Sequence, residues 1–334
     1  MMVAAHAGGE GPAAARLTAM ANATRSAVEA AAMTVLEDAE RAVGAGGFIV
    51  PHRLERLVRD LRTYLRQPNP DGALRAAGLA MAKGEWQPSR AGQERPHMML
   101  MQPETVTAER VLIVAPHPDD ETLGCGGLAA SFARLGRQIH TLFVTDGGAS
   151  HRRSAQWPRE RLAAQRETEA QAALVALGLD PAAATFLRLQ DAAMPPHGSP
   201  AWRAAAVAVA NLVERFDPDL VLLPWRRDPH CDHRDSWRLV TEVLAQRSPR
   251  PATLEYAIWL DELGEADDAP RPGEMEVVAF DVSAAADTKR WAVAAHVSQT
   301  SDLIADDPEG FRLTAETIDR LTGSVEKYLR PCDG

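Results

Sequence analysis

From residue 110 onward, short apolar runs alternate with longer amphipathic stretches. The apolar runs predict strands at 110–115, 139–145, 185–189, 219–224, 254–260 and 276–282. Helical patterns lie at 123–135, 160–177, 201–215 and 235–246, and the later stretches 284–297 and 311–329 are also predicted to be helical. Strands that alternate with helices form βαβ units, whose parallel strands are covered on both faces. We therefore predict an α/β protein with a Rossmann-like, mostly parallel sheet and helices on both faces.

The first hundred residues follow a different pattern. Residues 13–44 are rich in alanine with charges spread through them, and residues 52–66 carry leucines at helical spacing. Both stretches predict amphipathic helices. From Lys83 to Pro103 the sequence becomes rich in Gly, Pro, Gln, Arg and Met without a clear period, which indicates a linker. We predict a helical N-terminal extension and linker over 1–100 and an α/β domain over 101–334.

Composition narrows the class of protein. The chain has 334 residues, of which 46% are hydrophobic, enough for a full core. A net charge of -10 argues against nucleic acid or an anionic membrane as the main partner. The three cysteines, Cys125, Cys231 and Cys332, show no CxxC spacing, which predicts no disulfide framework. No apolar run is long enough to span a bilayer and the start does not resemble a secretory leader, so we expect a cytoplasmic protein, with a homo-oligomer left open.

Two clusters of histidine and carboxylate residues each follow a predicted strand. The run Pro116-His117-Pro118-Asp119-Asp120-Glu121 comes directly after 110–115, and His230-Cys231-Asp232-His233 comes after 219–224. We count these strands as the first and fourth of the domain. In the common doubly wound order those two strands are neighbours, and ligands bind outside their carboxyl ends. The sequence therefore predicts one crevice that both clusters line.

The residue types in this crevice fit a catalytic metal site. A catalytic zinc takes three protein ligands from His and carboxylate and keeps one position open, and His117, Asp120 and His233 could supply that set. Asp119 is then free to take a proton from water, and His230 could protonate a leaving group. A Lewis acid, a general base and a general acid are what amide hydrolysis requires. Zn²⁺ is the expected ion, with another divalent metal such as Fe²⁺ as the alternative.

Other interpretations of these residues stay open. Asp119, Asp120 and Glu121 could be carboxylates that the dipole of a following helix favours. Two histidines and one carboxylate also describe non-haem iron oxygenases, although that chemistry would not need Asp119 and His230 beside the ligands.

A further alternative is a dinucleotide-binding module or oxidoreductase. Gly124-Cys125-Gly126-Gly127-Leu128-Ala129 matches G-x-G-x-x-A, and Asp146 ends the next strand. That fingerprint needs its first glycine in the turn directly after the strand, whereas Pro116 to Leu123 intervene here. We therefore expect these glycines to serve packing.

At these positions the chain resembles the PIG-L or LmbE-like family of zinc-dependent N-acetylglucosaminyl deacetylases, over roughly residues 109–300. The resemblance rests on the His-Pro-Asp-Asp-Glu and His-x-Asp-His loops. It implies His117, Asp120 and His233 as zinc ligands, Asp119 as base and His230 as acid, with Asp232 orienting His230 or another group near the metal. It also implies that Arg166 and Asp191 hold sugar hydroxyls. The expected partner is a small N-acetylated amino-sugar substrate. Weaker matches include Arg166-x-x-Glu169, Lys289 and His296-x-Ser298-Gln299.

The resemblance is incomplete. Some family branches that act on thiol-conjugated sugars have a tyrosine two residues before the His-x-Asp-His motif, where this chain has Asp228. We interpret Cys231 as a packing residue rather than a soft metal ligand, and His296 as either a residue at the border of the site or a helix end. Candidates for a sugar-binding aromatic platform are Trp202, Trp225 and Trp237.

Overall fold

The computed structural model describes residues 21–22, 24–26, 28–29, 32–34, 36, 75 and 100–332. The chain divides into two units, 1–97 and 98–334. In the first unit, every described residue between 21 and 36 is helical, in agreement with the prediction over 13–44. The predicted helix 52–66 and most of the predicted linker 83–103 lie outside the described residues.

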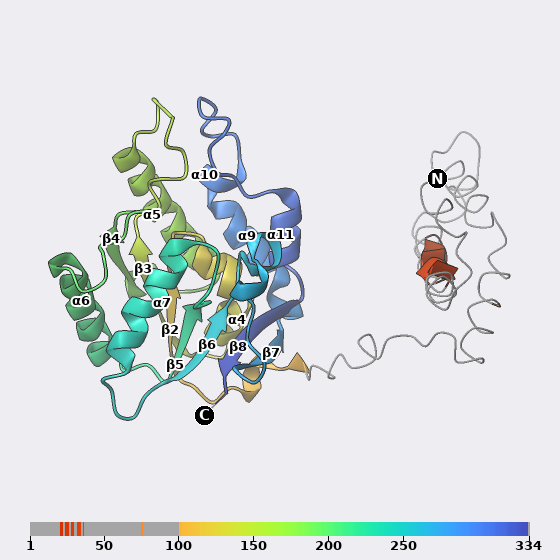
Figure 1. Ribbon diagram of the computed structural model, residues 1–334, viewed down its shortest axis with the longest axis horizontal. Coiled ribbons are helices and arrows are strands. Elements are labelled where there is room, and N and C mark those ends of the chain that lie inside the picture. The colour runs from red at the N-terminus through yellow and green to blue at the C-terminus, as the bar shows by residue number, and fades with distance from the viewer. Residues whose placement is uncertain are drawn as a thin grey trace. The chain divides into compact units, whose positions relative to one another are not determined.

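The described part of the second unit contains one mixed sheet in the order β1-β7-β8-β6-β5-β2-β3-β4 (Figure 1). The strands are β1 Leu100–Met101, β2 Arg110–Ala115, β3 Gln138–Thr145, β4 Ala184–Leu189, β5 Leu220–Pro224, β6 Ala252–Tyr256, β7 Met275–Asp281 and β8 Val325–Pro331. Strand β8 is antiparallel to β6 and β7, and the other neighbours run parallel. The predicted fold class is confirmed.

Helices cover both faces of this sheet. The longer ones are α4 Asp120–Arg134, α5 Arg159–Ala176, α6 Pro200–Phe216, α7 Cys231–Leu244 and α9 Ala286–Ala295. Shorter helices are η4 Pro103–Thr105, η5 Pro181–Ala183, α8 Leu260–Leu263, η6 Ala266–Asp268, η7 Ser283–Ala285, α10 Val297–Thr300 and α11 Ala315–Leu321. Among the described residues, no helix combines the length and apolarity needed to cross a membrane.

Strand β2 separates the two halves of the core because successive strand residues point to opposite faces. Its residues Val111, Ile113 and Ala115 pack in the cluster that includes α4, α5 and α9. Leu112 and Val114 pack in the other cluster, with α6 and α7. All five side chains are fully buried, as expected for a central strand of a parallel sheet.

The helix predicted over 311–329 is wrong in its second half. Helix α11 ends at Leu321, and β8 then inserts between β6 and β7. The alternation of apolar and polar residues along β8 is hard to recognise in the sequence, because the charged residue Glu326 occupies one of the inward-facing positions. Its carboxylate is buried and lies 2.7 Å from the Lys289 ammonium, which offsets the cost of burying the charge.

Candidate active site

The two His/Asp loops leave the sheet side by side. Strands β2 and β5 pair in parallel, with Ile113 opposite Leu222, so the predicted adjacency of the first and fourth strands is confirmed. Asp119 occupies the N-cap position of α4. His230 occupies the N-cap position of α7, where its ring accepts a hydrogen bond from the Asp232 N–H. The first turns of these helices therefore bring Asp120 and His233 to the same edge of the sheet.

The structure brings the three predicted metal ligands together through Asp120. Its Oδ2 atom lies 3.0 Å from His117 Nδ1 and 3.2 Å from His233 Nε2, and it accepts a hydrogen bond from the His117 backbone N–H. All three side chains are buried. The two imidazole rings lie 5.5 Å apart, centre to centre.

A second layer of carboxylates surrounds these histidines. Asp228 Oδ1 lies 3.4 Å from His233 Nδ1, and Asp232 Oδ2 lies 3.1 Å from His117 Nε2. Although burial opposes a charged ring, Asp120 and Asp228 outweigh it and raise the pKa of His233 to about 9. We call this cluster the His/Asp cage; it consists of His117, His233, Asp120, Asp228 and Asp232. It holds more negative than positive groups and therefore favours a bound cation.

These residues fit a divalent metal. Both ring nitrogens of His233 are buried without a hydrogen bond of proper geometry, which is unusual unless another partner binds the ring. A carboxylate on the far nitrogen, as Asp228 provides, is the common support for a metal-ligating histidine. Ring nitrogens of His117, His230 and His233 also lie within 4.8 Å of one another, so His230 is a further candidate ligand besides its predicted role as acid.

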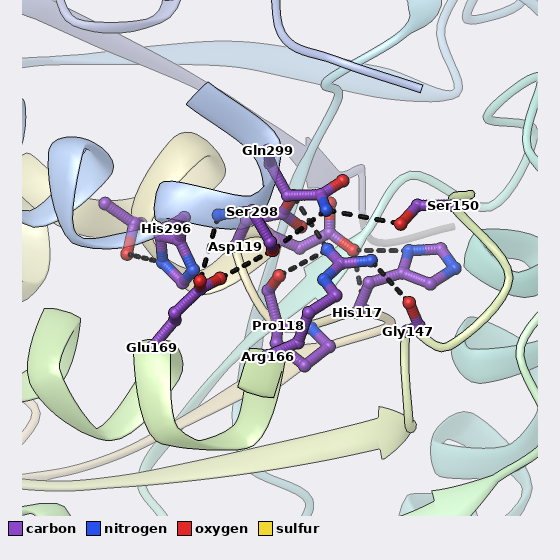
Figure 2. Close-up of polar contacts among 12 residues, drawn as sticks. His117, Pro118, Asp119, Gly147, Ser150, Arg166, Glu169, His296, Ser298 and Gln299 are labelled. Atoms are coloured by element: carbon purple, nitrogen blue, oxygen red, sulfur yellow. Dashed lines mark hydrogen bonds and ion pairs between the residues drawn. The ribbon is translucent and has the colours of Figure 1, made fainter. Parts of the chain in front are cut away.

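Asp119 stands beside this cluster in an unusual backbone conformation, with φ of 135°. Its N–H donates to Glu121 Oε2 at 2.9 Å, and its carboxylate pairs with Arg166 at 2.9 Å. Figure 2 shows Arg166 between Asp119 and the carbonyl oxygens of Pro118 and Gly147, to which it donates. Burial raises the pKa of Asp119 to about 6 although Arg166 opposes the shift, so the group suits proton transfer near neutral pH.

The contacts of Asp232 favour one of its two expected roles, orientation of another group near the metal, over orientation of His230. The carboxylate of Asp232 contacts His117 and accepts from the Ala192 N–H, while its own N–H donates to His230 Nδ1. Asp232 therefore supports His117, a predicted ligand, rather than the ring of His230. Burial, followed by the charges of His117 and His233, lowers the pKa of His230 to about 4, which argues against a ring that is protonated before the reaction.

These residues line a cavity of about 310 Å³. Its lining comprises His117, Asp119, Asp120, Ala149, Ser150, Arg152, Arg166, Asp191, Ala192, Pro229, His230, Trp259, Leu263 and Phe311. Arg166 and Asp191, predicted to hold sugar hydroxyls, therefore face the same space as the proposed base. Asp191 Oδ1 also lies 3.4 Å from His117 Nε2.

Several residues of the site were not recognised in the sequence. Trp259 and Phe311 form an edge-to-face pair, with ring centres 5.6 Å apart, on the cavity wall. They come from separate segments with no motif, so only the fold reveals them. The predicted aromatic candidates do not line the cavity, because Trp202 and Trp225 are buried in the core and Trp237 packs beside it.

Two other interpretations are also resolved. Cys231 is exposed, and its thiol lies 3.5 Å from Asp232, so the interpretation as a packing residue is wrong. His296 ends α9, is buried without lining the cavity, and lies 3.1 Å from Glu121 Oε1. A neighbouring set of contacts runs from Glu169 through Ser298 and Gln299 to Ser150, as Figure 2 shows.

The glycine-rich run lies inside α4 and not in a turn that could hold a pyrophosphate. A Cβ at Gly124 would lie 2.3 Å from the Tyr256 ring, and one at Gly127 would lie 2.8 Å from Val282. These glycines allow close packing, as expected, and the dinucleotide fingerprint has no structural counterpart here.

Fold and site together define a Rossmann-like α/β protein with a His/Asp cage at the carboxyl edge of its sheet. Residues 112–244 match the family model PIG-L, described as GlcNAc-PI de-N-acetylase. The resemblance seen in the sequence is therefore confirmed over residues 112–244.

One curated relative and two solved structures show what this chain is similar to. A 1D-myo-inositol 2-acetamido-2-deoxy-alpha-D-glucopyranoside deacetylase from Rhodococcus opacus is 27% identical over 248 residues, covering 59% of this chain and 83% of that protein. The N,N'-diacetylchitobiose deacetylase from Pyrococcus horikoshii has a similar fold, with a TM-score of 0.52, 20% identity and coverage of 72% of this chain and 91% of that one. The 4-carboxy-2-hydroxymuconate hydratase GalB from Pseudomonas putida also shares the fold, with a TM-score of 0.51, 18% identity and coverage of 68% and 97%.

Proposed function

We propose that this protein is a metal-dependent N-deacetylase that acts on an N-acetylated amino sugar or a related conjugate. The observation that carries the proposal is the convergence of His117, Asp120 and His233 beside the Asp119 carboxylate, inside a region that matches the PIG-L family. The deacetylases among its relatives act on substrates of this kind.

The ion we propose is Zn²⁺, held by His117, Asp120 and His233, with Fe²⁺ as the alternative. Such a metal would polarise the acyl carbonyl and favour ionisation of water. Asp228 and Asp232 would keep the two imidazoles oriented, since each carboxylate lies against a ring nitrogen.

Side chains of the protein would carry out the proton transfers. Asp119 takes one proton from the water whose oxygen attacks the acyl carbon. The carbon–nitrogen bond then breaks, and the leaving nitrogen receives the proton that Asp119 took, either directly or through His230, whose neutral ring first accepts it. Acetate and the free amine are the products. Arg166 keeps the Asp119 carboxylate in place, since it binds both that group and the preceding carbonyl.

The test is an assay for free amine over a panel of N-acetylated sugars. Release of one amine for each acetate formed is expected with the zinc-loaded protein. Because a hydratase shares the fold, hydration of an unsaturated tricarboxylic acid is the matched counter-assay. Hydration without any amine release from the panel would contradict the proposal.

A further inference from the structure

A second cavity opens next to the active-site cavity. Its volume is about 330 Å³. The two cavities share four lining residues: Ala149, Arg152, Asp191 and Ala192. A ligand bound beside Asp119 could therefore extend past Arg152 into the second cavity.

The second cavity has a positive lining although the whole chain carries a net charge of -10. Arg152 and Arg159 contribute cations, and Asp191 is the one carboxylate in the lining. Asp191 is already engaged, since it contacts His117 and accepts from the Ala149 N–H. Arg159 pairs with Asp146, which lies outside the lining. The remaining charge in the lining is that of Arg152, whose side chain is exposed to solvent.

Within the part of the chain that the structure describes, the exposed Arg152 side chain forms no hydrogen bond or ion pair and is open to a ligand. Its neighbour Arg153, by contrast, pairs with Glu309 on the surface. His151 also lines the second cavity, is only 2% exposed, and has no hydrogen-bond partner for Nε2 among the described residues. Two adjacent side chains thus present unused polar atoms around one cavity.

A guanidinium offers only donors, in a planar fork that matches the two oxygens of a carboxylate or a phosphate. We propose that the second cavity binds an anionic group, carboxylate or phosphate, carried by the portion of the substrate attached to the N-acetylated sugar. Arg152 donates to this anion from the junction of the two cavities. The identity of the sugar rests on the proposed function, whereas the anion site does not.

Calorimetric titration of the zinc-loaded full-length protein tests this site without requiring turnover. The probes are N-acetylglucosamine 1-phosphate, the carboxymethyl glycoside of N-acetylglucosamine, and the neutral methyl glycoside. Charged hydrogen bonds contribute about 1.5–3 kcal/mol, so Arg152→Gln should weaken at least one anionic probe by roughly tenfold or more. The neutral probe should change less than about twofold.

Arg153→Gln is the matched control, since it removes the same charge from the adjacent residue without altering the cavity lining. It should leave all three affinities unchanged. Equal weakening by both variants, or equal affinity of the normal protein for anionic and neutral probes, would overturn the proposal. A preference for phosphate alone or carboxylate alone supports it and identifies the group. Tight anion binding that depends on Arg152 without amine release would contradict only the proposed deacetylation.

Discussion

Asp119 is held by its neighbours in a conformation that few residues adopt. A φ of 135° is strained for a residue with a side chain, and such strain persists where the surroundings enforce it. Glu121 binds its N–H and Arg166 binds its carboxylate, so both ends of the residue are fixed. Glu121 is in turn placed by Thr122 and His296. The third acid of the His-Pro-Asp-Asp-Glu run therefore positions the proposed base.

Replacement of Asp119 and His230 should separate chemistry from metal binding. Loss of a group that transfers a proton costs about a hundred- to ten-thousand-fold in rate. Asp119→Asn should lose this much turnover and keep its metal, as measured by amine release and elemental analysis.

His230→Gln decides between two roles for that ring. Lost turnover with full metal content indicates proton transfer, whereas lost metal makes His230 a ligand. His197→Gln, at an exposed site, is the control. Turnover equal to that of the unmodified protein in His230→Gln would leave Asp119 as the group that protonates the leaving nitrogen.

At the scale of elements, α4 lies unusually close to its neighbours. Gly124 faces the ring of Tyr256 on β6, and the hydroxyl of Tyr256 donates to the Val114 carbonyl of β2 at 2.6 Å. The ring is therefore fixed and cannot move aside. This close approach brings the start of α4, with Asp119 and Asp120, to the edge of the sheet beside β5.

Gly124→Ala should destabilise the protein although alanine favours a helix. The gain in helix propensity is about 1 kcal/mol, while forcing a methyl group into a packed interior costs roughly 1–3 kcal/mol. A Cβ only 2.3 Å from a fixed ring points to the upper end of that cost. Urea unfolding should show a lower midpoint. Gly323→Ala, whose Cβ would meet no atom closer than 3.9 Å, is the control, and equal midpoints for the two variants would contradict the packing argument.

The segment between β5 and His230 is anchored by an ion pair between Arg227 and Glu274. From this pair we expect the stability of the fold to depend on pH. Hydrogen bonds from Arg227 lower the pKa of Glu274 to about 2, from an ordinary value of 4.5. A depressed carboxylate pKa stabilises the fold above pH 4.5, and that stabilisation is lost as pH falls toward 2.

Glu274→Gln should therefore lower the free energy of unfolding at pH 7 by about 1 kcal/mol, because the pair is partly exposed. Urea unfolding at several pH values should show the difference from the unmodified protein shrinking below pH 4.5. A difference that stays constant down to pH 2 would contradict the assignment.

Sequence patterns predicted elements well where the period was uninterrupted. The runs around Val111 and Leu222 gave the central strands and their adjacency. Strand β8 was missed because its inward Glu326 disguises the period, and β1 is too short to form a pattern. At the site, the local His-Pro-Asp-Asp-Glu and His-x-Asp-His motifs were enough to single out Asp119, Asp120 and His233. Trp259 approaches the cavity only through the tertiary fold, so no spacing rule could find it.

At the scale of the whole molecule, the described residues that line the two cavities all belong to the 98–334 unit. A chain beginning at Met98 should therefore fold and bind metal. A chain beginning at Thr105 would lack β1, which pairs with β7, and should unfold at a lower temperature. Circular dichroism melting and elemental analysis check both. Loss of metal from a folded Met98 chain would show that the first unit completes the site.

In the function we propose, amide hydrolysis requires a divalent ion that His117, Asp120 and His233 hold. The direct measurement is amine release from an N-acetylated amino sugar by metal-stripped protein as Zn²⁺ is added back. We expect activity to rise linearly and to saturate at about one equivalent, with no recovery in His233→Ala. Full activity of the stripped protein, or equal recovery in His233→Ala, would contradict the account.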